Sequence, residues 1–148
     1  MNLRHLVAAV ALVSLAVPAF AEPSAAGRVK VVSGSAFIIR GSEVMAAELG
    51  QPVFESDRVR TGSDGRLGIT LKDDTRFSLG PGSEVELSRF AYVPAQGRVA
   101  LALNVIRGMA AYVSGRIAKL SPDAVKLETP GAIVGVRGTT LALSVSPR

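Results

Sequence analysis

The stretch Asp57–Leu87, DRVRTGSDGRLGITLKDDTRFSLGPGSEVEL, decides the fold, because short runs of alternating apolar residues are separated in it by turn residues. Leu67, Ile69 and Leu71 lie on one side of an extended chain, since successive side chains of a strand point to opposite faces. Gly, Pro, Asp and Ser between the runs supply the backbone dihedrals that tight reversals need. The stretch therefore predicts consecutive short strands, each with one buried face.

Alternation of the same kind continues on both sides of this stretch. Turn residues return about every 8–12 residues, the spacing typical of an all-β sandwich or barrel. We expect further strands at 28–33, 35–40, 88–93, 98–106, 109–113, 132–137 and 140–145. The chain is therefore predicted to form a single all-β domain over residues 28–146, with roughly ten or more short strands in a sandwich-like or solenoid-like stack.

The pattern also makes predictions for single positions. Val29 and Val31 are expected on one face of the first strand. Arg107-Gly108 is expected to end a strand before the next one begins, and residues 116–120 to form a short arm. Gly138, between the last two strands, is expected at positive φ or in close packing, since a side chain would disturb either conformation.

The segment Ser42–Gly50, SEVMAAELG, is open to two interpretations. Ser42 could cap a short helix that Gly50 would end. Helices of this length are marginal on their own, and the neighbouring segments all predict strands. We therefore favour a strand and a loop here.

Residues 1–21 have the features of a secretory signal peptide. They contain a positively charged start and an apolar run at 6–17, which Pro18 ends before the small-x-small sequence Ala19-Phe20-Ala21. A membrane-spanning helix needs about 20 apolar residues, and this run is shorter. We expect cleavage between Ala21 and Glu22.

After cleavage, a short linker at 22–27 is expected to lead into the domain. The sequence contains no Cys, which excludes a lipoprotein anchor because that anchor requires a cysteine thiol. The mature chain is therefore expected to be soluble in the periplasm or outside the cell, with no stable membrane insertion.

The charge is moderately basic, with 17 Lys and Arg residues against 12 Asp and Glu residues. The basic residues are scattered along the chain, so we expect no nucleic-acid partner. A weak attraction to anionic envelope polymers such as peptidoglycan stays open.

The residues for most catalytic chemistry are missing from the mature chain. Its only His is His5, in the signal peptide, which removes the usual Ser-His and Cys-His nucleophiles and the usual zinc and copper ligands. Asp73 with Asp74 is interpreted as turn chemistry rather than a calcium or acid–base site. Glu84 with Glu86 is interpreted as a solvated strand face, although such a pair is also compatible with glycoside chemistry.

Two further features have structural interpretations. Gly131–Gly138, GAIVGVRG, lacks the G-x-G spacing of a nucleotide fingerprint, so its glycines are expected to mark a bend or close packing between strands. Phe77 is expected in the core. Tyr92 and Tyr112 are expected at more open positions, where they could contribute to a partner surface.

Three short motifs follow one another in a fixed order. An acidic residue precedes a Thr-Gly turn, a second turn is Asp-Asp-Thr, and a Thr-Pro sequence precedes a final Arg-Gly-Thr. The residues are Asp57, Thr61, Gly62, Asp73, Asp74, Thr129, Pro130, Arg137, Gly138 and Thr139. In order and spacing these motifs resemble the FecR domain family, with Asp74 where that family usually has Gly.

The resemblance implies an all-β periplasmic domain that works through protein contacts. In the best-known members this domain belongs to a transmembrane regulator, receives a signal from an outer-membrane iron-siderophore transporter and controls a sigma factor. We do not expect that anti-sigma role here, because the sequence shows neither a sigma-binding segment nor a transmembrane helix.

Three functions are compatible with these observations. The favoured one is a non-enzymatic periplasmic module that contacts another envelope protein in signalling or assembly. The alternative is a module that binds peptidoglycan, and a carboxylate-based glycan-active enzyme is favoured least. We expect no catalytic, cofactor-binding or metal-binding residues, and the motif residues are predicted to be structural.

Overall fold

The computed structural model describes residues 16–136, 138 and 140–146. This part of the chain is all-β, with one short helix, α1 (Arg116–Leu120), and two 3-10 turns, η1 (Pro94–Gln96) and η2 (Pro122–Ala124). The strands are β1 (Gly27–Ser33), β2 (Ala36–Arg40), β3 (Glu43–Ala46), β4 (Pro52–Val53), β5 (Arg58–Thr61), β6 (Arg66–Leu71), β7 (Arg76–Leu79), β8 (Glu84–Val93), β9 (Arg98–Val113), β10 (Val125–Thr129), β11 (Ala132–Gly135) and β12 (Thr140–Val145).

The described strands form one curled sheet in which the long strand β9 belongs to two layers. Its first part, 98–107, pairs with β8 on one side and in parallel with β10 on the other. Its last part, 108–113, pairs with β7 and β12. We call β4, β1, β6, β7, this last part and β12 the β6 layer. We call β3, β2, β5, β8, the first part of β9, β10 and β11 the β8 layer.

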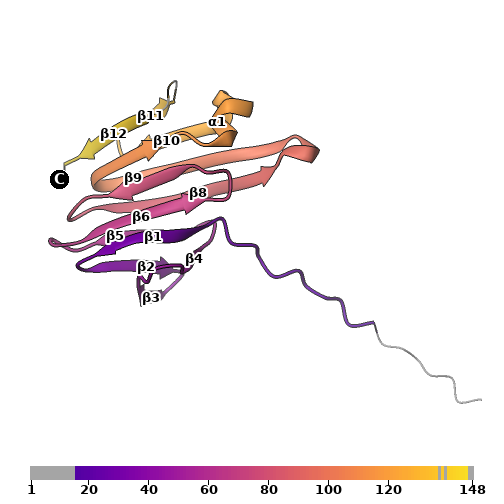
Figure 1. Ribbon diagram of the computed structural model, residues 1–148, viewed down its shortest axis with the longest axis horizontal. Coiled ribbons are helices and arrows are strands. Elements are labelled where there is room, and N and C mark those ends of the chain that lie inside the picture. Colours follow the sequence, from indigo (N-terminus) through magenta and orange to yellow (C-terminus); the bar gives the residue numbers. More distant parts are fainter. Residues whose placement is uncertain (1–15, 137, 139, 147–148) are drawn as a thin grey trace, which may run out of the picture.

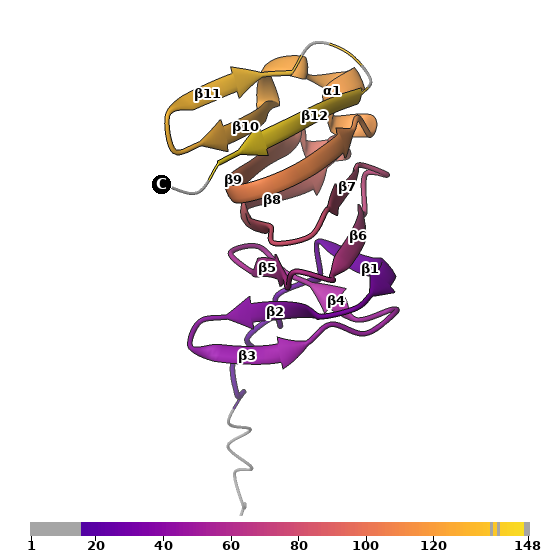
Figure 2. The same cartoon turned by 90° about the vertical axis from the view of Figure 1, so that its left-hand side faces the viewer.

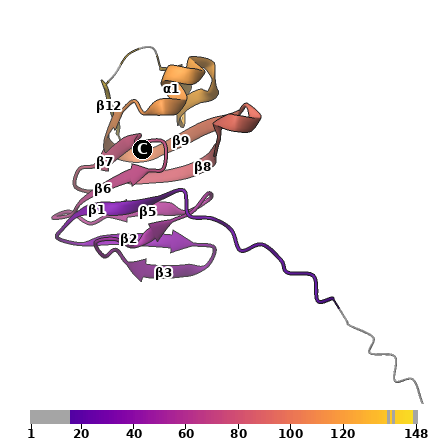
Figure 3. The same ribbon diagram turned by 45° about the vertical axis from the view of Figure 1, so that its right-hand side comes forward.

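The chain passes back and forth between the two layers from its N-terminal to its C-terminal strands. Figure 2 shows the resulting stack, from β2 and β3 at the bottom to α1, β11 and β12 at the top. Figure 3 shows β1, β6 and β7 one above another, in agreement with their antiparallel pairing. Ahead of β1, the chain from residue 16 runs away from the sheet without secondary structure (Figure 1).

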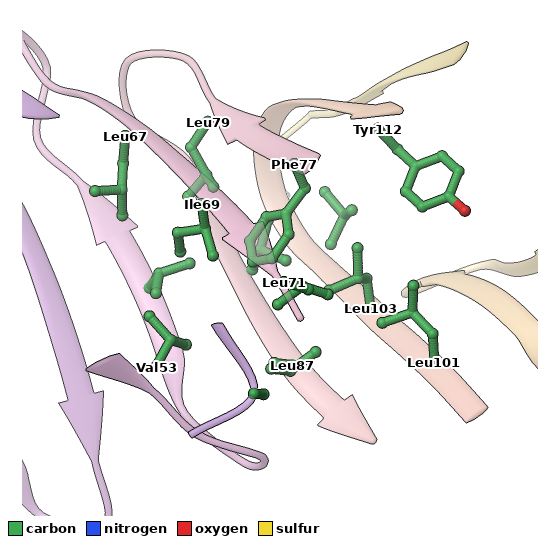
Figure 4. Packing of buried hydrophobic residues seen from close by; sticks show 14 of the residues in the cluster. Val53, Leu67, Ile69, Leu71, Phe77, Leu79, Leu87, Leu101, Leu103 and Tyr112 are labelled. Carbon is green, nitrogen blue, oxygen red and sulfur yellow. The ribbon is translucent and has the colours of Figure 1, made fainter. Parts of the chain in front are cut away.

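The core lies between the layers, where apolar side chains from both of them meet (Figure 4). Leu67, Ile69 and Leu71 are 1%, 1% and 2% exposed, so the alternation predicted for this stretch is confirmed. Phe77 is also buried, as expected, and it lines a small internal space with Leu103 of the β8 layer. The inner side of each layer is therefore buried in the core.

The prediction that Val29 and Val31 share a face is wrong. Val29 is fully buried, whereas Val31 is 55% exposed. The pairing of β1 with β6 shifts between them, opposite Ile69 and Gly68, because an extra residue forms a β-bulge. The bulge turns Val31 to the solvent side of the β6 layer.

Two further local features of the structure differ from the pattern of the sequence. Gly108 does not end a strand; β9 runs through it with a bend at φ 80°. Residues 116–120, predicted as a short arm, form helix α1, in which Ile117 is fully buried and its N–H donates to the Asp73 carboxylate at 3.1 Å. Both deviations depend on contacts that a local pattern does not contain.

The segment 42–50 contains strand β3 followed by a loop, so the favoured interpretation is confirmed. Ala47 N–H donates to the Ala36 carbonyl at 2.9 Å and extends the pairing beyond the strand. No helix in the described part of the chain is long and apolar enough to cross a membrane.

Candidate protein-binding face

Asp57, the first motif residue, is 1% exposed and fixes the entrance to β5. Its carboxylate accepts hydrogen bonds from Arg40 Nε at 2.9 Å, Arg40 Nη2 at 2.8 Å and Phe54 N at 2.9 Å. The Arg40 guanidinium also stacks on the Phe54 ring, 4.4 Å from its centroid. The hydrogen bond to Asp57 raises the pKa of Arg40. Both oxygens of the Asp57 carboxylate therefore accept hydrogen bonds, and the contacts with Arg40 connect β2 to β5.

Thr61 and Gly62 hold the end of β5 against the turn that precedes β8. Thr61 Oγ1 donates to the Gly80 carbonyl at 2.6 Å and accepts from Ser83 N at 2.9 Å. The Gly62 N–H donates to the Ser35 carbonyl at 2.9 Å, and a Cβ at position 62 would lie 3.0 Å from that of Ser35. This motif thus positions turns around the core.

Asp73 is fully buried and joins the β6–β7 turn to α1. Its carboxylate accepts from Thr75 N at 3.1 Å, Thr75 Oγ1 at 2.7 Å and Ile117 N at 3.1 Å. Its carbonyl accepts from Arg116 N at 2.7 Å. Asp74 is exposed, has φ 67° and pairs with Arg116 Nε at 3.1 Å. Asp74 therefore takes a conformation that suits glycine.

The last motif lies around the turn between β10 and β11 and beyond it. Thr129 Oγ1 donates to the Ala132 carbonyl at 3.3 Å, across the exposed Pro130. Gly138 has φ 135°, with no heavy atom within 4 Å of an added Cβ, so the positive φ is observed but close packing is not. Gly131 and Gly135 have the same open surroundings.

Arg137 and Thr139 lie outside the described residues. The other motif residues are distributed over separate turns, and the hydrogen bonds described above do not bring them into one site.

The interpretation of Glu84 and Glu86 as a solvated strand face is wrong for Glu84, which is buried. Glu84 is 8% exposed, and its carboxylate lies 3.4 Å from Arg58 Nη1 and 3.5 Å from Arg107 Nε. Glu86 is half-buried opposite Asn104. The Glu84 carboxylate is therefore engaged in ion pairs with two arginines. Among the described residues, no cluster of three or more His, Cys, Asp or Glu could hold a metal ion.

Tyr112 is also not part of an open surface, since it is 3% exposed. Its hydroxyl oxygen is buried and has no hydrogen-bond partner among the described groups. Burial raises the pKa of the Tyr112 hydroxyl. Tyr92 is half-buried on β8.

The outer side of the β6 layer carries small and apolar residues where a solvent-facing sheet usually carries polar ones. Five residues face one another across neighbouring strands, one from each of β1, β6, β7, β9 and β12. They are Val31, Gly68, Ser78, Ala111 and Ala142. Their sequence neighbours on β6 and β7, such as Ile69 and Phe77, are buried, so strand alternation turns this row outward. We call this row the small-residue row.

Gly68, Ser78, Ala111 and Ala142 of the small-residue row form the floor of a shallow groove of about 490 Å³. Met109 and Val31 stand above the floor, each 55% exposed. Val31 and Met109 pack close to the backbone of Gly68 and Gly80: an added Cβ would lie 3.1 Å from Val31 Cβ and 3.3 Å from Met109 Cε, respectively. The absence of a Cβ at these two glycines therefore leaves room for the Val31 and Met109 side chains to pack against the strand backbone.

A second hollow of about 450 Å³ adjoins the groove and shares Val31, Gly68, Ser78 and Ala111 with it. Among the described residues, the charged ones that line the two hollows are Arg66, Lys30 and Arg76, all exposed, and none is a carboxylate. The face is therefore apolar at its centre and positive around it.

The outer side of the β8 layer is different in kind. Arg58, Glu86, Asn104 and Glu128 are opposed across its strands in the positions that correspond to the small-residue row. Mixed charges and an amide make the centre of this side polar, and its exposed apolar residues, Val44 and Ile133, lie apart from each other on the outer strands β3 and β11. The contrast selects the β6 layer as the side suited to bind another molecule.

Sequence reasoning missed this face. A signal was present in the sequence. Alternation assigns four small, uncharged residues to the side of their strands that faces solvent: Gly68, Ser78, Ala111 and Ala142. The register that places them in one row is set by pairing between distant segments, which the alternation does not encode.

Together these features define an all-β domain with an exposed apolar sheet face. The chain matches the model of the family described as FecR protein over residues 57–148, and it belongs to this family. The resemblance seen in the sequence is thereby confirmed, and the family is associated with envelope signalling. Searches of curated proteins and of solved structures found no match.

Proposed function

We propose that this chain is a non-enzymatic periplasmic module that acts through protein–protein contacts in envelope signalling or assembly. The observation that carries the proposal is the apolar outer face of the β6 layer. A contiguous apolar surface on a soluble domain usually marks a contact site. Membership of the FecR family supports the same class of function.

The state of the carboxylates supports a non-enzymatic role. Asp57 and Asp73 are buried acceptors of several hydrogen bonds, and Glu84 lies between two arginines. None of these three carboxylates lines the groove. The polar side chains that line the groove are Arg66, Ser78 and Ser144, and the rest of its described lining is apolar or glycine.

We further propose that residues 1–21 direct export and are removed between Ala21 and Glu22. The apolar run that Pro18 ends supports this, and residues 16–24 are exposed and outside the sheet, so their loss removes no packing. Mass spectrometry of a periplasmic fraction should find a chain that begins at Glu22. A full-length chain retained in the membrane would contradict the proposal.

The contact function is tested with a photoreactive amino acid placed at Ala142, which is exposed on the apolar face. The matched control places it at Lys126, which is exposed on the β8 layer. We expect an adduct with an envelope protein from position 142 and not from position 126. The absence of any protein adduct, or an adduct with peptidoglycan, would refute the proposal.

A further inference from the structure

We propose that the groove of the β6 layer binds an amphipathic helix of another protein whose polar flanks are acidic. This inference rests on the proposed contact function and adds the chemistry of the partner. It follows from three properties of the groove: its charge, the small side chains of its floor, and the hydrogen bonding of its strands.

The charge of the groove requires an acidic occupant. Lys30, Arg66 and Arg76 line the two adjoining hollows, and no Asp or Glu of the described part of the chain lines them. A second copy of this face would bring these cations against their own counterparts, and like charges at an interface are unfavourable. Acidic side chains flanking an apolar stripe would instead meet a cation on either side of the floor.

The hydrogen bonding of the floor favours a helix over a strand. β6, β7 and β9 are each paired on both sides in this layer, so their backbone groups are already used. An occupant of an apolar floor gains no backbone hydrogen bonds from it and must satisfy its own, as a helix does. Four strand spacings make the row about 19 Å wide, enough for the diameter of about 10 Å of one helix.

The small side chains of the floor allow that helix to approach the sheet closely. Ser78, Ala111 and Ala142 carry at most one heavy atom beyond Cβ, whereas Met109 and Val31 stand higher and can pack against the sides of the helix. The apolar residues of the helix at positions i, i+3, i+4 and i+7 would then lie on the floor.

The test is a selection of random helix-forming peptides on the mature chain, followed by binding measurements with the enriched peptides. We expect these peptides to carry Asp or Glu beside an apolar stripe. The double variant Arg66→Glu/Arg76→Glu should weaken their binding at least tenfold, as should Ala142→Leu, which fills the floor. Lys126→Glu, a charge reversal on the β8 layer, should leave binding unchanged. Circular dichroism melting confirms that each variant is folded, and Arg66→Gln/Arg76→Gln replaces the reversal if that variant does not fold.

Several results would overturn the inference: no enriched peptide, enriched peptides that are basic or uncharged, or acidic peptides that bind both charge variants as tightly as the unaltered chain. Binding of anionic phospholipid vesicles that the same variants abolish would assign the groove to a lipid instead. A protein adduct from position 142 together with any of these results would leave the contact function standing and refute only the helix.

Discussion

Asp73 shows how one buried side chain holds two distant segments together. Its carboxylate accepts hydrogen bonds from Thr75 and, 44 residues further along the chain, from Ile117. Asp73→Asn keeps the shape but replaces one acceptor oxygen by a donor, which leaves buried N–H groups opposed. We expect this change to lower the free energy of unfolding by about 1.5–3 kcal/mol, measured by urea denaturation.

The neighbouring Asp74→Asn is the matched control. Asp74 is exposed, and its ion pair with Arg116 joins two largely exposed side chains. Asn tolerates the positive φ of this position. The change should alter the free energy of unfolding by less than about 0.5 kcal/mol. Equal losses in both variants would contradict the role assigned to the buried carboxylate.

Tyr112 presents the opposite case, a buried hydroxyl without a hydrogen-bond partner among the described groups. Because the hydroxyl has no partner among the described groups, Tyr112→Phe should raise the free energy of unfolding by about 1 kcal/mol. Chemical denaturation at neutral pH measures this change. A loss of stability would show that the hydroxyl is hydrogen-bonded in solution.

The same residue predicts sensitivity to alkali. Burial raises the pKa of Tyr112 in the folded chain above the ordinary value of about 10. The neutral hydroxyl is therefore favoured by folding, and its contribution is complete below pH 10. Above about pH 10 the unfolded chain loses this proton first, so the free energy of unfolding should fall as pH rises. The fall should be smaller in Tyr112→Phe when both chains are denatured at a series of alkaline pH values.

At the scale of elements, the bend of β9 at Gly108 allows one strand to serve both layers. Gly108 has φ 80°, and an added Cβ would collide with Ser83 Oγ and lie 2.6 Å from Ser83 Cα and 2.7 Å from the Gly82 carbonyl oxygen. We expect Gly108→Ala to lower the free energy of unfolding by more than about 3 kcal/mol, through backbone strain and overpacking together.

Gly97→Ala separates these two contributions. Gly97 also has positive φ, 64°, but nothing lies within 4 Å of an added Cβ. Only backbone strain is introduced, so the loss should be about 1–2 kcal/mol. Thermal or urea denaturation of both variants measures the difference. If the two losses are equal, crowding at Ser83 does not fix the bend.

The elements also show where sequence reasoning succeeds. Alternation placed Leu67, Ile69 and Leu71 correctly, because side-chain period alone decides which face of an isolated strand is apolar. It failed at Val31 and Gly108, where a bulge and a bend depend on the partner strand. The apolar face could not be predicted for the same reason, since the row from Val31 to Ala142 exists only after five strands have paired.

At the scale of the whole molecule, the family match and the folding unit have different boundaries. The match begins at Asp57, after β1–β4. Those strands contribute Val29, Ile38 and Val53 to the core, each of them 0% exposed. β1 also pairs with β6, and Arg40 supplies two of the hydrogen bonds to Asp57. The segment before the match is therefore part of the structure that the match describes.

A fragment of residues 57–148 should consequently fail to fold alone. Removing Val29, Ile38 and Val53 forfeits about 5–9 kcal/mol of burial, which is similar to the total stability of about 5–15 kcal/mol of a typical domain. It also leaves β6 unpaired along one edge and removes Arg40, the ion-pair partner of Asp57. Residues 22–148 are the control, since 16–24 lie outside the sheet. We expect cooperative thermal unfolding by circular dichroism for residues 22–148, none for 57–148, and recovery when a peptide of residues 22–56 is added. Cooperative unfolding of the fragment alone, near the melting temperature of the control, would show that β1–β4 are an accessory.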